Sequence, residues 1–221
     1  MIRVNADELQ RRETAIEGTD FQIDVRNEDG SGGLTIKGTP IVYNRECVIY
    51  EGDHFRLTEI IEPGAARDAL LRAEQVLLWN HDSAKPMAAR KNNTLSAREG
   101  ESGVYIEADV SGTVWGRDGH EAIKSGLVDK MSFGFYLKED GYTEERFVEN
   151  GKRCCKRTLK KFDRIVDFSP VTYPAYQDTG VTARDAESAL KEFDEEDEKR
   201  NETKEKISSL LSEFTEIKIS A

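Results

Sequence analysis

The sequence contains few of the residues on which disulfide frameworks and metal centres are built. Only three cysteines and three histidines occur among its 221 residues. The cysteines, Cys47, Cys154 and Cys155, show no Cys-x-x-Cys or Cys/His ligand spacing, and adjacent cysteines rarely bridge to each other. We therefore expect three reduced thiols, as in a cytosolic compartment, with no metal and no cofactor.

Long apolar segments and a surplus of positive charge are also missing. No stretch approaches the roughly 18 uninterrupted apolar residues of a membrane span, and residues 1–18 lack the apolar run of a signal peptide. The 32 Lys and Arg residues against 43 Asp and Glu residues give a formal net charge of -11. Binding to phosphates needs the opposite balance, so we expect a soluble intracellular protein with no nucleic acid substrate and no membrane partner.

Short segments of alternating apolar residues are typical of β-strands. We expect strands at residues 19–25, 34–43, 55–61, 75–79, 94–98, 104–110, 130–137 and 157–168, and helices at residues 63–73 and 117–125. Many short strands with two short helices predict a mainly β domain over residues 19–183, folded as a closed or half-closed β-barrel.

The two ends of the chain differ in composition from this domain. Residues 1–18 are polar, which favours a frayed N-terminal tail, with a short helix over Asp7–Ala15 as the alternative. Residues 184–221 form an acidic tail, and from Asp185 onward it carries twelve acidic and six basic side chains. Its apolar residues at helical spacing are Ile207, Leu210, Leu211, Phe214 and Ile217. A solvated charged helix and a docking helix for a partner both fit this pattern.

A general base for chemistry near neutral pH is sought first among the three histidines. His54 follows a polar turn and His120 belongs to a polar helix, so both are expected at the surface. His81 comes directly after the apolar segment 75–79, which should be core. A buried strand fixes the backbone of the residue that follows it, which suits a catalytic base. A half-buried histidine with a structural hydrogen bond is the alternative.

A candidate nucleophile lies on the strand expected at residues 130–137. Met131, Phe133 and Phe135 share one face, so Ser132 and Gly134 share the other. We expect Gly134 to leave room there for another backbone or a peptide substrate. An ordinary strand serine is the alternative.

The third group of such a site would orient the histidine and stabilise its cation. Asp167 ranks first, because a carboxylate flanked by Val166 and Phe168 needs a partner. Asp163 on the same strand ranks second. Asp82 ranks third because it directly follows His81, and the side chains of successive residues in an extended chain point to opposite sides.

Several blocks of sequence, taken in order, resemble the caudoviral prohead protease family. They are Gly38–Asn44, Glu59–Ala65, Trp79–Asp82, Lys124–Phe135 and Val166–Ala175. The Asn-His-Asp, Met-Ser-Phe-Gly-Phe and Ser-x-Val-Thr-x-Pro-Ala motifs together are specific, although each alone is common. The resemblance covers roughly residues 34–183.

This resemblance implies a β-barrel serine protease, distantly similar to the herpesvirus assemblins. Such enzymes act inside the immature capsid, cutting scaffold or the scaffold-like segment of the major capsid protein and often themselves, and self-association is possible. Carried over by motif, His81 is the base and Ser132 the nucleophile. The third position, commonly glutamate in the family, is Asp167 here.

Three other functions are compatible with parts of the sequence. A non-catalytic scaffold or capsid-assembly factor would use the charged tail as its working part. A metal hydrolase would use His81 and Asp82 as ligands, although three histidines are few for that chemistry. A cysteine protease built on Cys47 is the most remote alternative.

Overall fold

The computed structural model is mainly β with few helices, as the sequence predicts. It describes residues 9–14, 22–24, 33–138, 140–172, 187, 189–191, 193–195 and 198–208. Among the described residues, none of the helices combines the length and the apolar character that crossing a bilayer requires.

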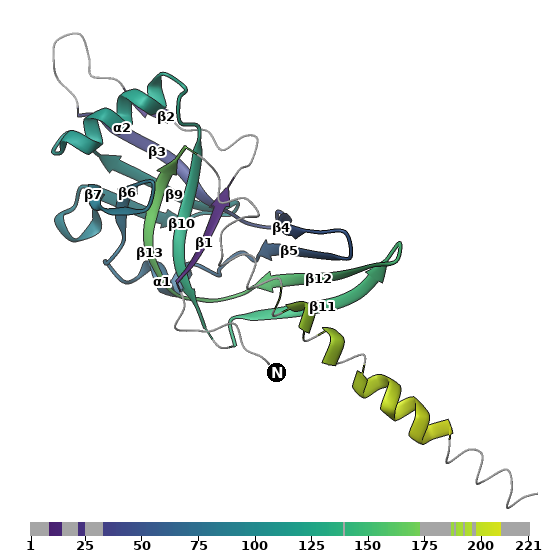
Figure 1. Ribbon diagram of the computed structural model, residues 1–221. Coiled ribbons are helices and arrows are strands. Elements are labelled where there is room, and N and C mark those ends of the chain that lie inside the picture. Colours follow the sequence, from purple (N-terminus) through teal and green to yellow (C-terminus); the bar gives the residue numbers. More distant parts are fainter. Residues whose placement is uncertain are drawn as a thin grey trace, which may run out of the picture.

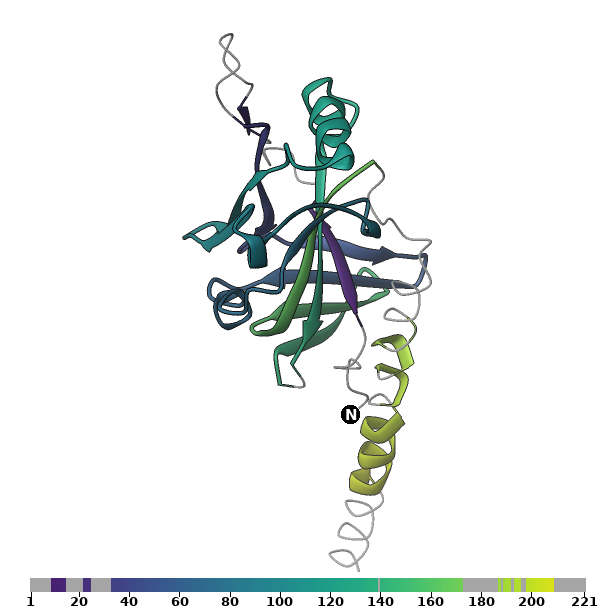
Figure 2. The ribbon, with the colours of Figure 1, turned by 90° about the vertical axis from the view of Figure 1, so that its left-hand side faces the viewer.

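A five-stranded sheet forms the centre of the molecule and carries Ser132 and Asp167 on its strands and His81 in the turn between two of them. Its strand order is β1-β10-β13-β6-β7. The strands are β1 (Gln10–Thr14), β10 (Lys130–Leu137), β13 (Phe162–Val171), β6 (Val76–Trp79) and β7 (Asp82–Ala89). Strands β13, β10 and β1 run side by side through the middle of the molecule (Figures 1 and 2). Sequence positions far apart are therefore placed next to each other.

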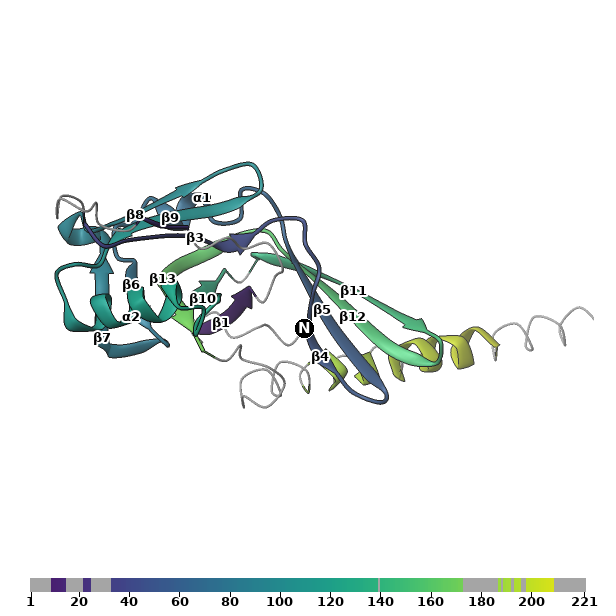
Figure 3. The same cartoon turned by 90° about the horizontal axis from the view of Figure 1, so that it is seen from above.

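Two four-stranded sheets flank the central one. The first has the order β11-β12-β5-β4, formed by β11 (Tyr142–Glu149), β12 (Lys152–Leu159), β5 (Phe55–Ile61) and β4 (Cys47–Glu51). The second has the order β2-β3-β9-β8, formed by β2 (Gln22–Asp24), β3 (Thr35–Val42), β9 (Gly103–Asp109) and β8 (Leu95–Glu99). Seen from above, the β11–β12 and β4–β5 hairpins project away from the end that carries α2 (Figure 3).

The helices are short. They are α1 (Arg67–Leu70), the 3-10 turn η1 (Arg90–Asn92) and α2 (Val114–Lys124). Helix α2 begins earlier than residue 117, because the Thr113 side chain caps it by accepting a hydrogen bond of 2.9 Å from the Gly116 backbone N–H. Gly126 follows its end with φ +75°, the conformation expected for a glycine there.

The predicted strands 55–61, 75–79 and 130–137 agree closely with β5, β6 and β10. The single strand predicted over residues 157–168 is wrong, because β12 ends at Leu159 and β13 begins at Phe162. Strands β4 and β7 were not predicted. Within the described residues the three strand orders do not close a ring, so an assemblin-like barrel stays a prediction.

The alternating apolar residues of β10 form part of the hydrophobic core, as predicted. Met131, Phe133 and Phe135 are fully buried, and the Phe135 ring packs against that of Phe162 with centroids 4.6 Å apart. Aromatic pairs at this separation add to the stabilisation from burial. The packing fixes β10 rigidly, and with it the backbone of the intervening Ser132.

The N-terminal segment departs from the expected tail. Gln10–Thr14 form β1, which pairs antiparallel with β10. The predicted frayed tail, and its helical alternative, are therefore wrong for these five residues. Their sequence, QRRET, has no apolar alternation. The described contacts that hold the strand are backbone pairing with β10 and an ion pair between Arg12 and Glu59 of β5.

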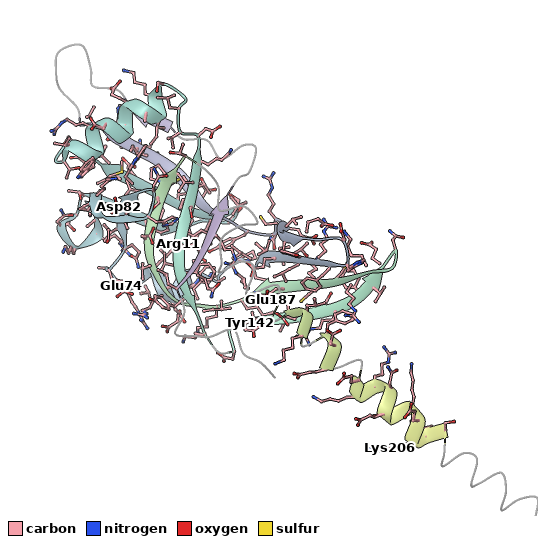
Figure 4. The ribbon with its side chains drawn as sticks, viewed as in Figure 1. Arg11, Glu74, Asp82, Tyr142, Glu187 and Lys206 are labelled. Atoms are coloured by element: carbon pink, nitrogen blue, oxygen red, sulfur yellow. The ribbon has the colours of Figure 1, made fainter. Side chains whose placement is uncertain are left out.

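The described C-terminal residues are helical (Figure 4). Ala189 and Phe193 are buried, and Ala189 packs with Phe55 and Leu57 of β5. Residues 198–208 are exposed throughout, including Ile207. The other members of the predicted apolar stripe, at positions 210–217, lie outside the described residues.

Candidate active site

His81 lies in the tight turn that joins β6 to β7. Trp79 pairs with Asp82, so the turn has two residues, Asn80 and His81, with φ of +51° and +57°. Positive φ at both positions is the type I′ pattern of short hairpins, and asparagine and histidine accept it better than most residues. The turn places the imidazole at the end of a strand packed against the core.

Hydrogen bonds tie this turn to the end of β13. The Asn80 backbone N–H donates to the Pro170 carbonyl at 3.1 Å, and the Thr172 N–H donates to Asn80 Oδ1 at 2.9 Å. The His81 N–H donates to Ser169 Oγ at 3.2 Å. The backbone of His81 is therefore fixed from the strand that also carries Asp167.

The three side chains singled out from the sequence meet in space. His81 Nε2 lies 2.5 Å from Ser132 Oγ, and His81 Nδ1 lies 2.5 Å from Asp167 Oδ1. Ser169 Oγ donates to the same Asp167 oxygen at 2.8 Å. The side chains of His81 and Asp167 are 8% and 6% exposed, and Ser132 is fully buried.

This arrangement defines the proton chemistry available at the site. A carboxylate beside Nδ1 accepts the Nδ1–H and leaves the Nε2 lone pair facing the serine hydroxyl. Nε2 can then accept the Ser132 proton while Asp167 stabilises the resulting imidazolium. Water is largely excluded, which strengthens both electrostatic contacts.

Gly134 serves a purpose different from the one expected. It pairs with Asp167 across β10 and β13, and a Cβ built on it would lie 2.3 Å from Asp167 Oδ2. The space over the face of Gly134 is thus filled by the carboxylate rather than by another backbone. The backbone that lies beside Gly134 is that of Arg11 of β1, which pairs with it at the edge of the strand.

The other carboxylates weighed from the sequence have different partners. Asp163 forms ion pairs with Arg72 and Arg164, at 3.7 Å and 3.4 Å. Asp82 accepts the Ala84 N–H at 2.9 Å and pairs with Lys85 at 3.0 Å, and these two contacts lower its pKa. Asp167, by contrast, contacts the His81 ring.

Of the two remaining histidines, one lies where it was predicted and the other does not. His54 is exposed, as predicted. His120 was expected at the surface but is fully buried in α2, and neither ring nitrogen has a hydrogen-bond partner in the described part of the chain. It shares its buried face with Gly116, Gly119 and Ile123. Because two of these residues are glycines, the buried face of α2 has no apolar periodicity in the sequence.

The thiols of Cys47 and Cys155 are poorly suited to act as nucleophiles. Burial raises the pKa of Cys47, and burial together with Glu144 raises that of Cys155 to about 11. Both shifts disfavour the reactive thiolate. Over the described ranges, no three His, Cys, Asp or Glu side chains gather as a metal site would require.

Sequence reasoning missed three residues around the site: Ser169, Asn80 and Arg12. The first two lie inside motif blocks that were noted, but their hydrogen bonds depend on tertiary contacts between β13 and the β6–β7 turn. Arg12 lies in the segment treated as a tail, and its carbonyl oxygen accepts a hydrogen bond of 3.1 Å from Ser132 Oγ. No local pattern in the sequence points to that contact.

A serine, a histidine and a carboxylate in series are the arrangement that serine hydrolases use, here on a mainly β fold. Residues 21–208 match the family model described as caudovirus prohead serine protease, and the chain belongs to that family.

Individual relatives are more distant. The prohead protease of Enterobacteria phage HK97 is 27% identical over 128 residues, which are 57% of this chain and 52% of that protein. The match therefore spans about half the length of this relative. The solved capsid assembly protease of bacteriophage T4 is 13% identical, with a TM-score of 0.45 over 76% of this chain and 98% of that one.

Proposed function

We propose that this chain is a serine endopeptidase of phage capsid maturation, with Ser132 as nucleophile, His81 as general base and Asp167 as the carboxylate that orients His81. The observation that carries the proposal is the position of the His81 ring, with Ser132 Oγ and Asp167 Oδ1 each 2.5 Å from a different ring nitrogen. Family membership supplies the class of reaction.

The proposed reaction has two halves. His81 takes the Ser132 proton as the hydroxyl attacks a peptide carbonyl, and then returns a proton to the departing amine. Water, activated by the same imidazole, hydrolyses the acyl-enzyme ester and restores Ser132. Asp167 holds the imidazole in the required tautomer and stabilises its cation, while the bond from Ser169 Oγ holds Asp167.

The proposed substrates are scaffold or the scaffold-like segment of the major capsid protein, and this chain itself. The support is the family, whose description places these proteases in proheads. The site of action is accordingly the assembling prohead in the host cytoplasm. The proposed catalytic domain is residues 19–183, with an assemblin-like barrel as its finer architecture.

Co-expression with the major capsid protein of the same phage, followed by intact-mass analysis, tests the proposal. Ser132→Ala should abolish cleavage of the capsid protein and of the chain itself, with circular dichroism unchanged. Ser125→Ala, on the exposed C-cap of α2, is the matched control and should cleave normally. Undiminished cleavage by Ser132→Ala would remove Ser132 as the nucleophile, and alkylation of Cys47 should leave cleavage untouched.

The acidic C-terminal tail, residues 184–221, is the proposed docking element for the assembling shell. Its support is that Ala189 and Phe193 are helical and buried, whereas residues 198–208 are helical and exposed. Ending the chain at residue 197 keeps the packed turns and removes the exposed part. The shortened chain should cleave a peptide normally but enter proheads poorly, and normal packaging would refute the docking role.

A further inference from the structure

The candidate nucleophile cannot be reached by a substrate in this structure. Ser132 is fully buried, although a peptide carbonyl must approach its hydroxyl from outside. Its outer neighbour is β1, whose residue Glu13 pairs with Ser132 in the antiparallel register. Strand β1 is also the edge of the central sheet, so it lies between β10 and an incoming peptide strand at that edge.

The contact between β1 and the nucleophile is made through the main chain. Ser132 Oγ donates to the Arg12 carbonyl oxygen at 3.1 Å while lying 2.5 Å from His81 Nε2. A serine hydroxyl has one proton, so it serves only one of these acceptors at a time. When Arg12 receives the proton, His81 does not, and the serine is not activated.

Among the described contacts, strand β1 is held by its main chain and by the side chain of Arg12. The sequence QRRET offers the strand no aliphatic or aromatic side chain. Its specific anchor is Arg12, which pairs in a fork with the buried Glu59 and lies over the Phe135 ring at 5.6 Å. Strand β1 is also held by the backbone ladder with β10, which any extended peptide can reproduce.

We propose that the edge of β10 beside Ser132 is the binding site for the extended peptide substrate, and that β1 occupies it as an intramolecular substrate mimic that inhibits the enzyme. The proposal rests on the proposed function, because it assigns the occupant of that same site. The substrate enters as an antiparallel strand after β1, including Arg12, has left this edge. The enzyme therefore recognises the substrate at this edge through main-chain hydrogen bonds.

The rate of labelling of Ser132 by a fluorophosphonate probe tests this in the full chain, with no need to know the natural substrate. Arg12→Ala removes the anchor but leaves Glu59 paired with Arg157 at 3.2 Å, so the buried carboxylate keeps a partner. We expect labelling of Arg12→Ala to be about tenfold faster or more, as expected for loss of a charge-assisted fork. Arg11→Ala, an exposed neighbour on the same strand (Figure 4), should label at the wild-type rate.

A synthetic peptide with the sequence of residues 9–14 supplies the second measurement. It should slow labelling of Arg12→Ala in a competitive, concentration-dependent manner, and a scrambled peptide should not. Arg12→Lys, which keeps the charge but not the fork, should label at an intermediate rate and replaces Arg12→Ala if that variant fails to fold. A product that begins at Glu13 would also support the proposal, since the cut requires β1 in the peptide site.

The outcomes separate this proposal from the proposed function. Labelling that depends on Ser132 but is equal in wild type and the folded Arg12 variant would overturn the inhibitory role of β1 and leave the serine protease standing. A competing peptide without effect would overturn the binding edge. Absence of Ser132-dependent labelling in every variant would overturn the nucleophile itself, and the inference with it.

Discussion

Gly134 and Asp167 lie opposite each other on neighbouring strands, and the Asp167 carboxylate fills the space that a side chain on residue 134 would occupy. A Cβ on residue 134 would stand 2.3 Å from Asp167 Oδ2 and 3.2 Å from Asp167 Cγ. A carboxylate end can rotate away from such a clash, but rotation moves it from His81 Nδ1. The glycine therefore sets the position of the carboxylate.

Gly134→Ala should impair activity more than stability. Because the Asp167 carboxylate must turn away from His81, we expect the cleavage rate to fall about 100-fold, as a 1 Å misplacement can produce. The free energy of unfolding should fall by about 1–3 kcal/mol from overpacking. Gly112→Ala, where an added Cβ meets nothing within 4 Å, is the control and should change neither the cleavage rate nor the denaturation midpoint. Wild-type cleavage by Gly134→Ala would show that the carboxylate position is unimportant.

Asp167→Asn should separate charge from shape at the orienting position. An asparagine fits the same space but can present an N–H to His81 Nδ1, which favours the wrong tautomer. By analogy with the triad mechanism, we expect a loss of about 10⁴-fold in kcat. Asp163→Asn, on the same strand but paired with arginines, should retain most of the activity. A loss of less than tenfold in Asp167→Asn would exclude Asp167 from the orienting role.

The local pattern placed Ser132 and His81 on or beside buried strands, and the resemblance to the protease family assigned them, together with Asp167, to one site. Alternation of Met131, Phe133 and Phe135 fixed the strand of the serine, and the apolar segment before His81 fixed the end of β6. These signals are set by the hydrophobic pattern within a few residues. Their consequence survives into the tertiary structure because both strands pack on one core.

Strand β1 could not be predicted, because its stability comes from partners more than 40 residues away. Its polar sequence carries no periodic signal, and the Arg12–Glu59 pair joins positions that nothing local connects. His120 was misplaced for a related reason, since Gly119 on the buried face of α2 lets the helix approach Trp79 and Met87 closely. A pattern of apolar side chains in the sequence does not reveal close packing at a glycine, which has no side chain.

The Asn80 turn allows the backbone and the side-chain contributions to be tested separately. Asn80→Gly keeps the positive φ but loses the amide bond to the Thr172 N–H, whereas Asn80→Ala also strains the turn by about 1–2 kcal/mol. Both should lower kcat by about 10- to 100-fold, through a looser His81, with little change in KM. Thermal unfolding should show a larger loss for Asn80→Ala than for Asn80→Gly.

A second asparagine with positive φ provides the control for the two Asn80 variants. Asn93 has φ +61° and follows η1, away from the β6–β7 turn. Asn93→Gly should keep wild-type kcat. If Asn80→Gly also kept it, the bonds between the turn and β13 would have no part in positioning His81.

Glu59 gives the protein an acid-sensitive stability. It is 3% exposed, and although burial alone would raise its pKa, the guanidinium groups of Arg12 and Arg157 outweigh this effect and lower it. A carboxyl whose folded pKa lies below its unfolded value of 4.5 contributes its full stability above that value. The contribution is then lost as the pH falls through the folded pKa.

Glu59→Gln should therefore change both the size and the pH dependence of stability. At neutral pH it leaves two buried guanidinium groups without their shared carboxylate, which should cost about 3–5 kcal/mol. Below about pH 4.5 the wild type should lose stability steeply, whereas Glu59→Gln should show a shallower slope, so the two curves converge as the pH falls. Urea midpoints measured from about pH 3 to 7 give both curves. Glu62→Gln, an exposed neighbour, should follow the wild type, and parallel curves for wild type and Glu59→Gln would contradict the assignment of the titration to Glu59.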